Sequence, residues 1–186
     1  LTVLVQLLAR NSALLDKLES AWARISKPAL KLLDWRNRNT KEQSRKNISA
    51  HYDLGNAMFA LFLDPTMMYS SAVFTKDTQT LQAASELKLK TICDKLALKP
   101  SDHVVEIGTG WGGFAIYAAT HYGCKVTTTT ISQQQYALAK ARIHEAGLQD
   151  RITLLLEDYR LLTGTFDKLV SIEMIEAVGY QFFDTY

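Results

Sequence analysis

The sequence has no run of about 18 uncharged apolar residues, the length that a membrane-spanning helix needs, so we predict no transmembrane segment. Its opening stretch, LTVLVQLLA, is preceded by no cationic stretch and followed by no small-residue cleavage site, so no signal peptide is predicted. The only cysteines, Cys93 and Cys124, stand in apolar or strand-like contexts, and we interpret them as buried thiols of a cytoplasmic protein rather than as a disulfide. The four histidines have no His or Cys partner at metal-ligand spacing, so no metal site is predicted.

Charge is unevenly distributed along the chain. Residues 1–50 hold ten Lys or Arg against four Asp or Glu, a net charge of +6, whereas the other 136 residues hold eleven against fifteen, a net charge of −4. A basic segment beside a mildly acidic one suggests an anionic partner, either phospholipid or nucleic acid. A solvated helix face explains the same pattern equally well, so charge alone leaves the partner open.

The chain divides into three predicted segments. Residues 1–46 are expected to form a basic helical arm that ends in a polar linker, because their apolar residues recur near a 3.6-residue period. Residues 47–99 are expected to be mainly helical, with a first helix over residues 56–63 that ends at Asp64-Pro65. Residues 100–186 are expected to form an α/β domain.

In the third segment the pattern alternates between strands and helices. Ser132 is the predicted cap of one of these helices, as Thr80 is of the helix before the sheet, because a hydroxyl can accept from the first helical turn. Alternation at this spacing predicts βαβ units in a doubly wound, mostly parallel sheet, with further strands expected beyond Tyr186. The predicted strands are residues 103–108, 125–131, 152–158 and 168–173, and helices are predicted over residues 113–122 and 132–146.

The motif GTGWGG, residues 108–113, follows a predicted strand and opens a helix, which is the setting of nucleotide-binding glycine loops. A nicotinamide site needs a carboxylate at the end of the second strand, about 20 residues on, but residues 127–130 are four threonines. Glu106 instead stands two residues before the first glycine, where its charge can balance the cationic end of S-adenosylmethionine. Asp158, at the end of the third strand, is placed to accept a hydrogen bond from an adenine amine. The motif therefore favours S-adenosylmethionine over NAD, and Trp111 could either stack on the adenosine or anchor the loop.

Six segments in a fixed order carry a more specific signal. They are HYDLGN (51–56), LFLDPTMMYSSAVF (61–74), VVEIGTGWGG (104–113), TTISQQQ (129–135), EDYR (157–160) and SIEMIEAVG (171–179). Together they resemble the cyclopropane-fatty-acyl-phospholipid synthases, a family that includes mycolic acid cyclopropane synthases and related acyl-chain methyltransferases. The resemblance covers about residues 47–186 and implies a Rossmann-like, class I methyltransferase fold.

The resemblance also implies roles for individual residues. The resemblance implies that residues 47–99 form a helical lid that covers substrate and cofactor, and His51 and Tyr52 match the part of that lid over the family's substrate tunnel. The positions that match cofactor contacts are Tyr69 and Ser70 at the methionine end, Gly108 and Gly110 in the loop, Thr130 and Gln135 at the ribose, and Asp158 and Tyr159 beside the adenine.

An anion site is implied as well. Glu176 matches a carboxylate that in the family holds bicarbonate at the reacting carbon, and Ser71 stands where most members have cysteine. An alkene has no proton to lose before it attacks the methyl group, so a base is needed afterwards, when a proton must leave for the ring to close. Bound bicarbonate can act as that base and can balance the developing positive charge. Ala177 replaces the family's histidine, which leaves a ring or a branched chain open as product; Glu173 and Glu176 could also simply favour the positive end of a helix.

These features predict S-adenosylmethionine-dependent transfer of a methyl or methylene group to the double bond of an unsaturated acyl chain of phospholipid. We expect a cytoplasmic enzyme that associates peripherally with the membrane surface and not with nucleic acid. Two alternatives stay open. Small-amine N-methyltransferases share these motifs and need no membrane contact, and a non-catalytic cofactor-binding fragment would keep the glycine loop.

Overall fold

The computed structural model of this chain describes residues 56–77, 80–179, 182–184 and 186, all of which belong to one compact unit, residues 41–186. The predicted arm, residues 1–46, lies outside the described residues, so the division into three segments stays a prediction. Within the described part of the chain, no helix is both long enough and apolar enough to cross a bilayer.

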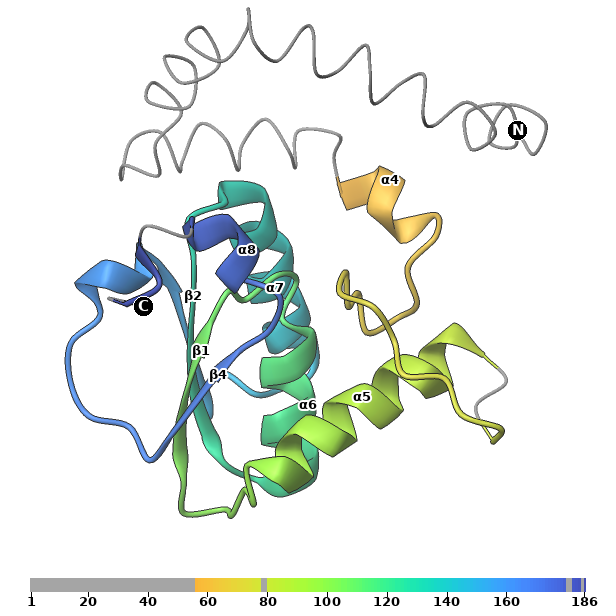
Figure 1. The fold of residues 1–186 in the computed structure, drawn as a ribbon, viewed down its shortest axis with the longest axis horizontal. Helices are drawn as coiled ribbons and strands as arrows, with labels where there is room; N and C mark the ends of the chain where they lie inside the picture. Colours follow the sequence, from red (N-terminus) through yellow and green to blue (C-terminus); the bar gives the residue numbers. More distant parts are fainter. Residues whose placement is uncertain (1–55, 78–79, 180–181, 185) are drawn as a thin grey trace, which may run out of the picture. The chain divides into compact units, whose positions relative to one another are not determined.

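A parallel sheet of four strands organises the described residues, as the alternating pattern predicted (Figure 1). Its strands are β1 (His103–Ile107), β2 (Lys125–Thr130), β3 (Ile152–Leu156) and β4 (Lys168–Ser171), in the order β3-β2-β1-β4. The chain moves outward from β1 to β3 and then crosses back to place β4 on the other side of β1. The order therefore reverses at β1, and crevices for ligands form at such a reversal, outside the carboxyl ends of the strands.

Three helices pack on one face of this sheet: α5 (Leu81–Lys95), α6 (Gly113–Tyr122) and α7 (Gln133–Glu145). The predicted caps are confirmed, because Thr80 Oγ1 accepts from the backbone of Ala83 at 3.2 Å and Ser132 Oγ accepts from the backbone of Gln135 at 3.3 Å. Each cap satisfies one backbone donor that a helix start leaves unpaired.

The core lies between these helices and the sheet. Its buried members come from all three helices and all four strands, and include Leu89, Cys93, Val104, Phe114, Ala118, Cys124, Val126, Ile143, Ile152 and Val170. Both cysteines are buried and unbridged, as predicted. Burial raises the pKa of Cys93 to about 12, so this thiol stays protonated and acts as a small apolar group.

The opposite face of the sheet is covered differently. The connection between β3 and β4 contains only a short 3₁₀ helix, η1 (Tyr159–Leu161), and runs back across the face as an extended loop (Figure 1). After β4 the chain forms α8 (Ile175–Val178), a single turn at the carboxyl end of the sheet.

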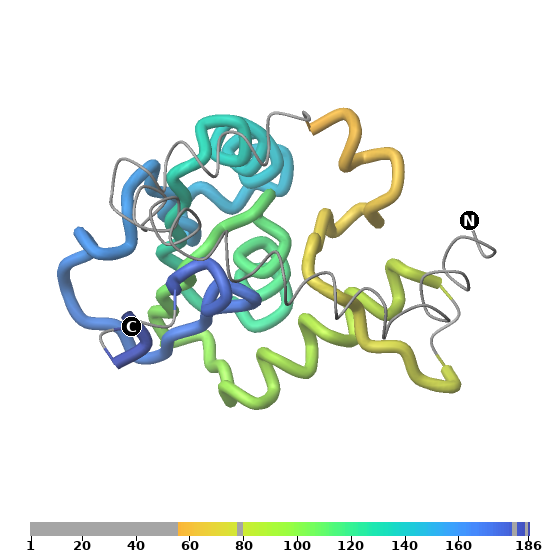
Figure 2. The backbone as a smooth tube through the Cα atoms, turned by 45° about the horizontal axis from the view of Figure 1, so that its top comes forward, coloured from red at the N-terminus to blue at the C-terminus, as the bar shows by residue number. Residues whose placement is uncertain are grey.

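An irregular segment precedes α5. It follows α4 (Asn56–Ala60), which ends three residues before the predicted position, and Figures 1 and 2 agree in placing residues 61–77 beside α5. The buried carboxylate of Asp64 fixes the start of this segment, since it accepts from Thr66 at 2.9 and 3.0 Å and from Ser85 on α5 at 3.0 Å. The segment is thereby held against the helical layer.

Candidate functional site

The glycine loop leaves β1 at the carboxyl edge of the sheet. Gly108, Gly110 and Gly112 all have positive φ, at 95°, 52° and 85°, which residues with a Cβ rarely adopt. A Cβ on Gly108 would lie 2.8 Å from Cγ of Met174, whereas a Cβ on Gly110 would meet no atom within 4 Å. Gly110 therefore presents bare backbone to open space, which is the condition for a nucleotide to approach closely.

Trp111 anchors the loop. Its side chain is 1% exposed, and its Nε1 donates to Oδ1 of Asn56 at 2.8 Å. The centroid of its ring lies 4.8 Å from the ring centroid of Phe59. Arg142, on α7, donates to the backbone carbonyl of Trp111 and also to the carbonyls of Pro65 at 2.8 Å and Thr66 at 3.2 Å. Of the two predicted uses of Trp111, its burial favours the anchor.

Glu106 lies beneath this loop. Its side chain is almost completely buried on β1, where Oε2 accepts a hydrogen bond of 2.6 Å from Thr128 on β2. Burial raises the pKa of Glu106 to about 8, and the Thr128 hydrogen bond offsets only part of that effect. The carboxyl group is therefore mostly protonated at neutral pH. Its role as a counter-charge to the cofactor stays a prediction. The buried carboxyl group does not favour that role, because its protonated form carries no charge.

The end of β2 holds the two residues predicted at the ribose. Oγ1 of Thr130 lies 3.0 Å from Oε1 of Gln135 and also accepts from the backbone of Ser132 at 3.1 Å. Both side chains are buried, at 7% and 6% exposure. The structure thus brings Thr130 and Gln135 together at the carboxyl edge, one strand away from the glycine loop.

The predicted adenine segment follows β3. Asp158 caps η1 and is buried, and its two carboxylate oxygens accept from Arg160 at 2.6 to 3.0 Å. Tyr159 is half-buried, and its ring lies edge-on to that of Tyr186 at 5.4 Å. Asp158 therefore has a cation beside it, so any adenine contact must be shared with Arg160.

Tyr69, Ser70 and Ser71 lie in the irregular segment and are tied to α5. Nζ of Lys88 donates to Ser70 Oγ at 2.5 Å and to the backbone carbonyl of Ser71 at 2.9 Å. Tyr69 is about half exposed, with its ring edge-on to that of Phe59 at 5.4 Å. This arrangement holds the predicted methionine-end residues in the irregular segment, where Tyr69 and Ser71 are exposed and Ser70 is half-buried.

The predicted anion site is arranged differently from the expectation. Ser71 donates from both its backbone N and its Oγ to Oε1 of Glu173, at 3.3 and 3.4 Å. Glu176 is exposed on α8, and within the described residues it makes no hydrogen bond to Ser71. The carboxylate beside Ser71 is thus Glu173, at the end of β4.

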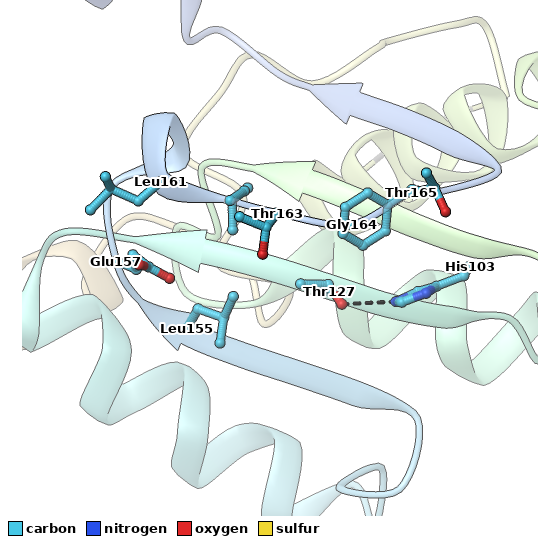
Figure 3. Close-up of a pocket in the computed structure, with 10 residues that line it drawn as sticks. His103, Thr127, Leu155, Glu157, Leu161, Thr163, Gly164 and Thr165 are labelled. Atoms are coloured by element: carbon cyan, nitrogen blue, oxygen red, sulfur yellow. Dashed lines mark hydrogen bonds between the residues drawn. The ribbon is translucent and has the colours of Figure 1, made fainter.

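His51 and Tyr52, the predicted lid residues, lie outside the described residues. A pocket of about 340 Å³ lies on the opposite face of the sheet, under the β3–β4 connection, where His103 Nε2 and Thr127 Oγ1 are 2.8 Å apart (Figure 3). No residue predicted to contact the cofactor lines this pocket, so it is separate from the site at the carboxyl edge.

Two cations in the site were missed from the sequence, Lys88 and Arg142. Both sit on helices whose charged residues resemble an ordinary solvated face. A signal was nevertheless present, because Lys88 follows Ala84 by four residues and Arg142 follows Ala139 by three, which places each cation beside the buried stripe of its helix. A cation in an apolar stripe indicates a buried acceptor nearby.

Comparison with known proteins places this arrangement in a family. The model of the mycolic acid cyclopropane synthetase family matches residues 39–186, about four fifths of the chain. The chain belongs to this family. The Escherichia coli K12 protein named cyclopropane-fatty-acyl-phospholipid synthase is 48% identical over 136 residues, which cover 73% of this chain and 34% of that protein. The tuberculostearic acid methyltransferase UfaA1 of Mycobacterium tuberculosis H37Rv is 43% identical over 155 residues, covering 80% and 36%.

Solved structures also show a fold similar to that of this chain. The mycolic acid cyclopropane synthase CmaA1, in a complex with SAH and CTAB, superposes with a TM-score of 0.72 at 33% identity, covering 76% of this chain and 50% of that one. Coclaurine N-methyltransferase, at a TM-score of 0.61 and 19% identity, shares the fold. The class I methyltransferase fold predicted from the motifs is therefore confirmed. The chain spans about a third of the length of each of the two curated relatives named above.

Proposed function

We propose that this chain binds S-adenosylmethionine and forms part of an enzyme that transfers the cofactor's methyl carbon to the double bond of an unsaturated acyl chain of phospholipid. When bound, the cofactor supplies an electrophilic methyl group on a sulfonium. The chain's own residues have to bind the two ends of the cofactor and orient that methyl group towards an apolar substrate.

One observation carries the cofactor assignment: the open side of Gly110 lies at the carboxyl edge of the sheet, one strand from the Thr130–Gln135 pair. A nucleoside that lies across this edge meets bare backbone at β1 and neutral polar groups at β2. A dinucleotide site would need a carboxylate at the end of β2, where the chain has Thr129 and Thr130. The fold, the loop and the family membership therefore support the same cofactor.

The exposed side chains of α4 and of the irregular segment support an apolar substrate. Six large apolar side chains of residues 58–74 are exposed, namely Met58, Leu61, Phe62, Tyr69, Val73 and Phe74. Exposed apolar side chains grouped in one segment are typical of lipid or protein contact surfaces. A small amine would leave them in water, so the acyl chain is the better supported substrate, and the basic residues 1–50 are suited to an anionic membrane surface.

The bicarbonate that the resemblance implied does not fit the described residues. Both donors of Ser71 already point at the carboxylate of Glu173, and Glu176 is not joined to them. An added anion would have to displace a side-chain carboxylate that shares its charge. We therefore assign no step to bicarbonate.

Cells that express the gene for this chain test the proposal. With S-adenosylmethionine labelled in its methyl group, we expect label in the phospholipid fraction and a gain of one CH₂ on unsaturated chains by mass spectrometry. Gly110→Val is the matched control, since its side chain would occupy the open side of the loop. Label that appears in small aqueous amines, with lipids unchanged, would contradict the acyl substrate and favour an N-methyltransferase.

A further inference from the structure

Three donors converge on one carboxylate oxygen at the mouth of the site. Oε1 of Glu173 lies 3.3 Å from the backbone N of Ser71, 3.4 Å from its Oγ and 3.6 Å from Nζ of Lys88. The donors come from the irregular segment and from α5, whereas the carboxylate comes from the end of β4. An amide, a hydroxyl and an ammonium around one oxygen form an anion-binding niche.

The buried ammonium of Lys88 requires a negative charge beside it in this niche. The side chain of Lys88 is 11% exposed, and burial lowers its pKa while Glu173 raises it. An ammonium held in a largely desolvated place is stable only beside a negative charge. Within the described residues, Glu173 supplies the carboxylate that lies within ion-pair distance of this ammonium.

Glu173 adopts an uncommon backbone conformation at this position. Its φ is +51°, in the left-handed region that residues with a Cβ rarely occupy. Met174, the next residue, packs against Gly108 of the glycine loop, so the turn lies directly beside the cofactor edge. The strained backbone aims a carboxylate into the niche that Ser71 and Lys88 form.

We propose that the carboxylate of Glu173 is the resident anion of this site and takes the place that the family resemblance assigns to bicarbonate. The role of this anion in methyl transfer rests on the proposed function. The occupancy of the niche does not, because it can be measured without cofactor or substrate. Lys88 is a positioning residue in this account: it orients Ser70, Ser71 and Glu173 together. A protein with a built-in carboxylate here has no requirement for an external anion.

The test empties the niche and refills it from solution. Glu173→Gly is the main variant, since glycine accepts the φ of +51° without strain. Its thermal midpoint is measured in formate, bicarbonate or chloride at a fixed pH and ionic strength. For an anion that binds with a Kd of about 10 mM, about 100 mM should raise the midpoint by about 3–6 °C over chloride. The unchanged chain should show no difference between these salts.

Matched variants identify the niche. Glu173→Gln fills the space with a neutral amide and should show no anion-dependent rise. Adding Lys88→Met to Glu173→Gly should abolish the rise, whereas adding Lys90→Met, which removes an exposed ammonium paired with Asp94 on the same helix, should preserve it. A midpoint that formate or bicarbonate leaves unchanged in Glu173→Gly, or that they raise equally in the unchanged chain, would overturn the proposal.

A parallel titration with S-adenosylhomocysteine separates the two proposals. If Glu173→Gly shows the anion-dependent rise and the chain fails to bind S-adenosylhomocysteine, the niche stands and the proposed function falls. If the chain binds S-adenosylhomocysteine and no variant responds to anions, the proposed function stands and the resident-anion role is wrong.

Discussion

The hydroxyl of Thr128 donates a hydrogen bond of 2.6 Å to Oε2 of Glu106, on the neighbouring strand and beneath the glycine loop. A second hydroxyl, that of Thr109 in the loop, lies 2.7 Å from Thr128 Oγ1. The three side chains are buried and join β1, β2 and the loop through one chain of hydrogen bonds. Neutral Glu106 therefore supports the loop from below, and its ionisation would place an unpaired charge in the core.

The titration of Glu106 predicts how stability depends on pH. Its pKa is about 8 in the folded chain and has its ordinary value of 4.5 in the unfolded chain. Between these values the unfolded chain loses the proton and the folded chain keeps it, so the free energy of unfolding should fall as pH rises from 4.5 towards 8. The slope from this group is at most about 1.4 kcal/mol per pH unit. Urea unfolding across this range measures it.

Glu106→Gln should flatten that pH dependence, because an amide oxygen still accepts from Thr128 but does not titrate. Glu145→Gln, an exposed substitution on α7, is the control and should leave the slope unchanged. If Glu106→Gln and the unchanged chain lose stability in parallel as pH rises, Glu106 is ionised in the folded state and its role as a neutral support is wrong.

Gly110→Ala should separate loop strain from cofactor contact. Gly110 and Gly147 both have positive φ, 52° and 66°, and both have open space where a Cβ would stand. Alanine should therefore cost each site about 1–2 kcal/mol of stability. Only Gly110→Ala should weaken S-adenosylhomocysteine binding, by roughly tenfold or more, because its methyl group would stand where the cofactor approaches. Equal affinities in the two variants would mean that the cofactor does not lie against Gly110.

Arg142→Lys should loosen the loop anchor. The guanidinium bonds three backbone carbonyls, on Pro65, Thr66 and Trp111, and a lysine ammonium cannot keep that fork geometry. Leaving part-buried carbonyls unpaired should cost about 1–3 kcal/mol in chemical unfolding. Arg151→Lys, at an exposed arginine that bonds the carbonyl of Gly123, should change stability by less than half as much. Equal losses of stability in both variants would show that the hydrogen bonds of Arg142 stabilise the fold no more than the exposed hydrogen bond of Arg151.

The sequence predicted the elements well where local chemistry decides them. Thr80 and Ser132 start helices because a hydroxyl caps the first turn, and that interaction involves only neighbouring residues. The alternation of strand and helix patterns over residues 103–173 predicted the parallel sheet for a similar reason, because each pattern can be recognised from neighbouring residues. The predicted helix over residues 56–63 was too long at its end, because the polar contacts of Asp64 with Thr66 and Ser85 fix a turn there.

Which side chains meet in the site was harder to predict from the sequence than the secondary structure. The partner of Ser71 is Glu173, 102 residues away, and the next residue, Met174, packs on Gly108, which is also distant in the sequence. Glu106 looked like a counter-charge because of its distance from the first glycine. Its position two residues after Val104, on the same face of β1, is what buries it, and depth of burial depends on helices that pack on that face.

The charge of residues 1–50 predicts salt-sensitive attachment to membranes. Their net charge of +6 should bind the chain to anionic vesicles at low salt, and the attraction should weaken as the Debye length falls from about 10 Å at 0.1 M salt to about 3 Å at 1 M. Sedimentation with anionic and with neutral vesicles measures this. Equal binding to both kinds of vesicle would favour a solvated helix face instead.

Calorimetric titration of the chain with S-adenosylhomocysteine and, separately, with NAD tests the central claim most directly. The glycine loop is compatible with either ligand, and the carboxyl end of β2, with Thr130 and Gln135 in place of a carboxylate, is what distinguishes them. We expect S-adenosylhomocysteine to bind at least about a hundredfold more tightly than NAD, and Thr130→Val to weaken that binding by about three- to tenfold, the value of one neutral hydrogen bond. Tighter binding of NAD, or no binding of S-adenosylhomocysteine, would contradict the assignment.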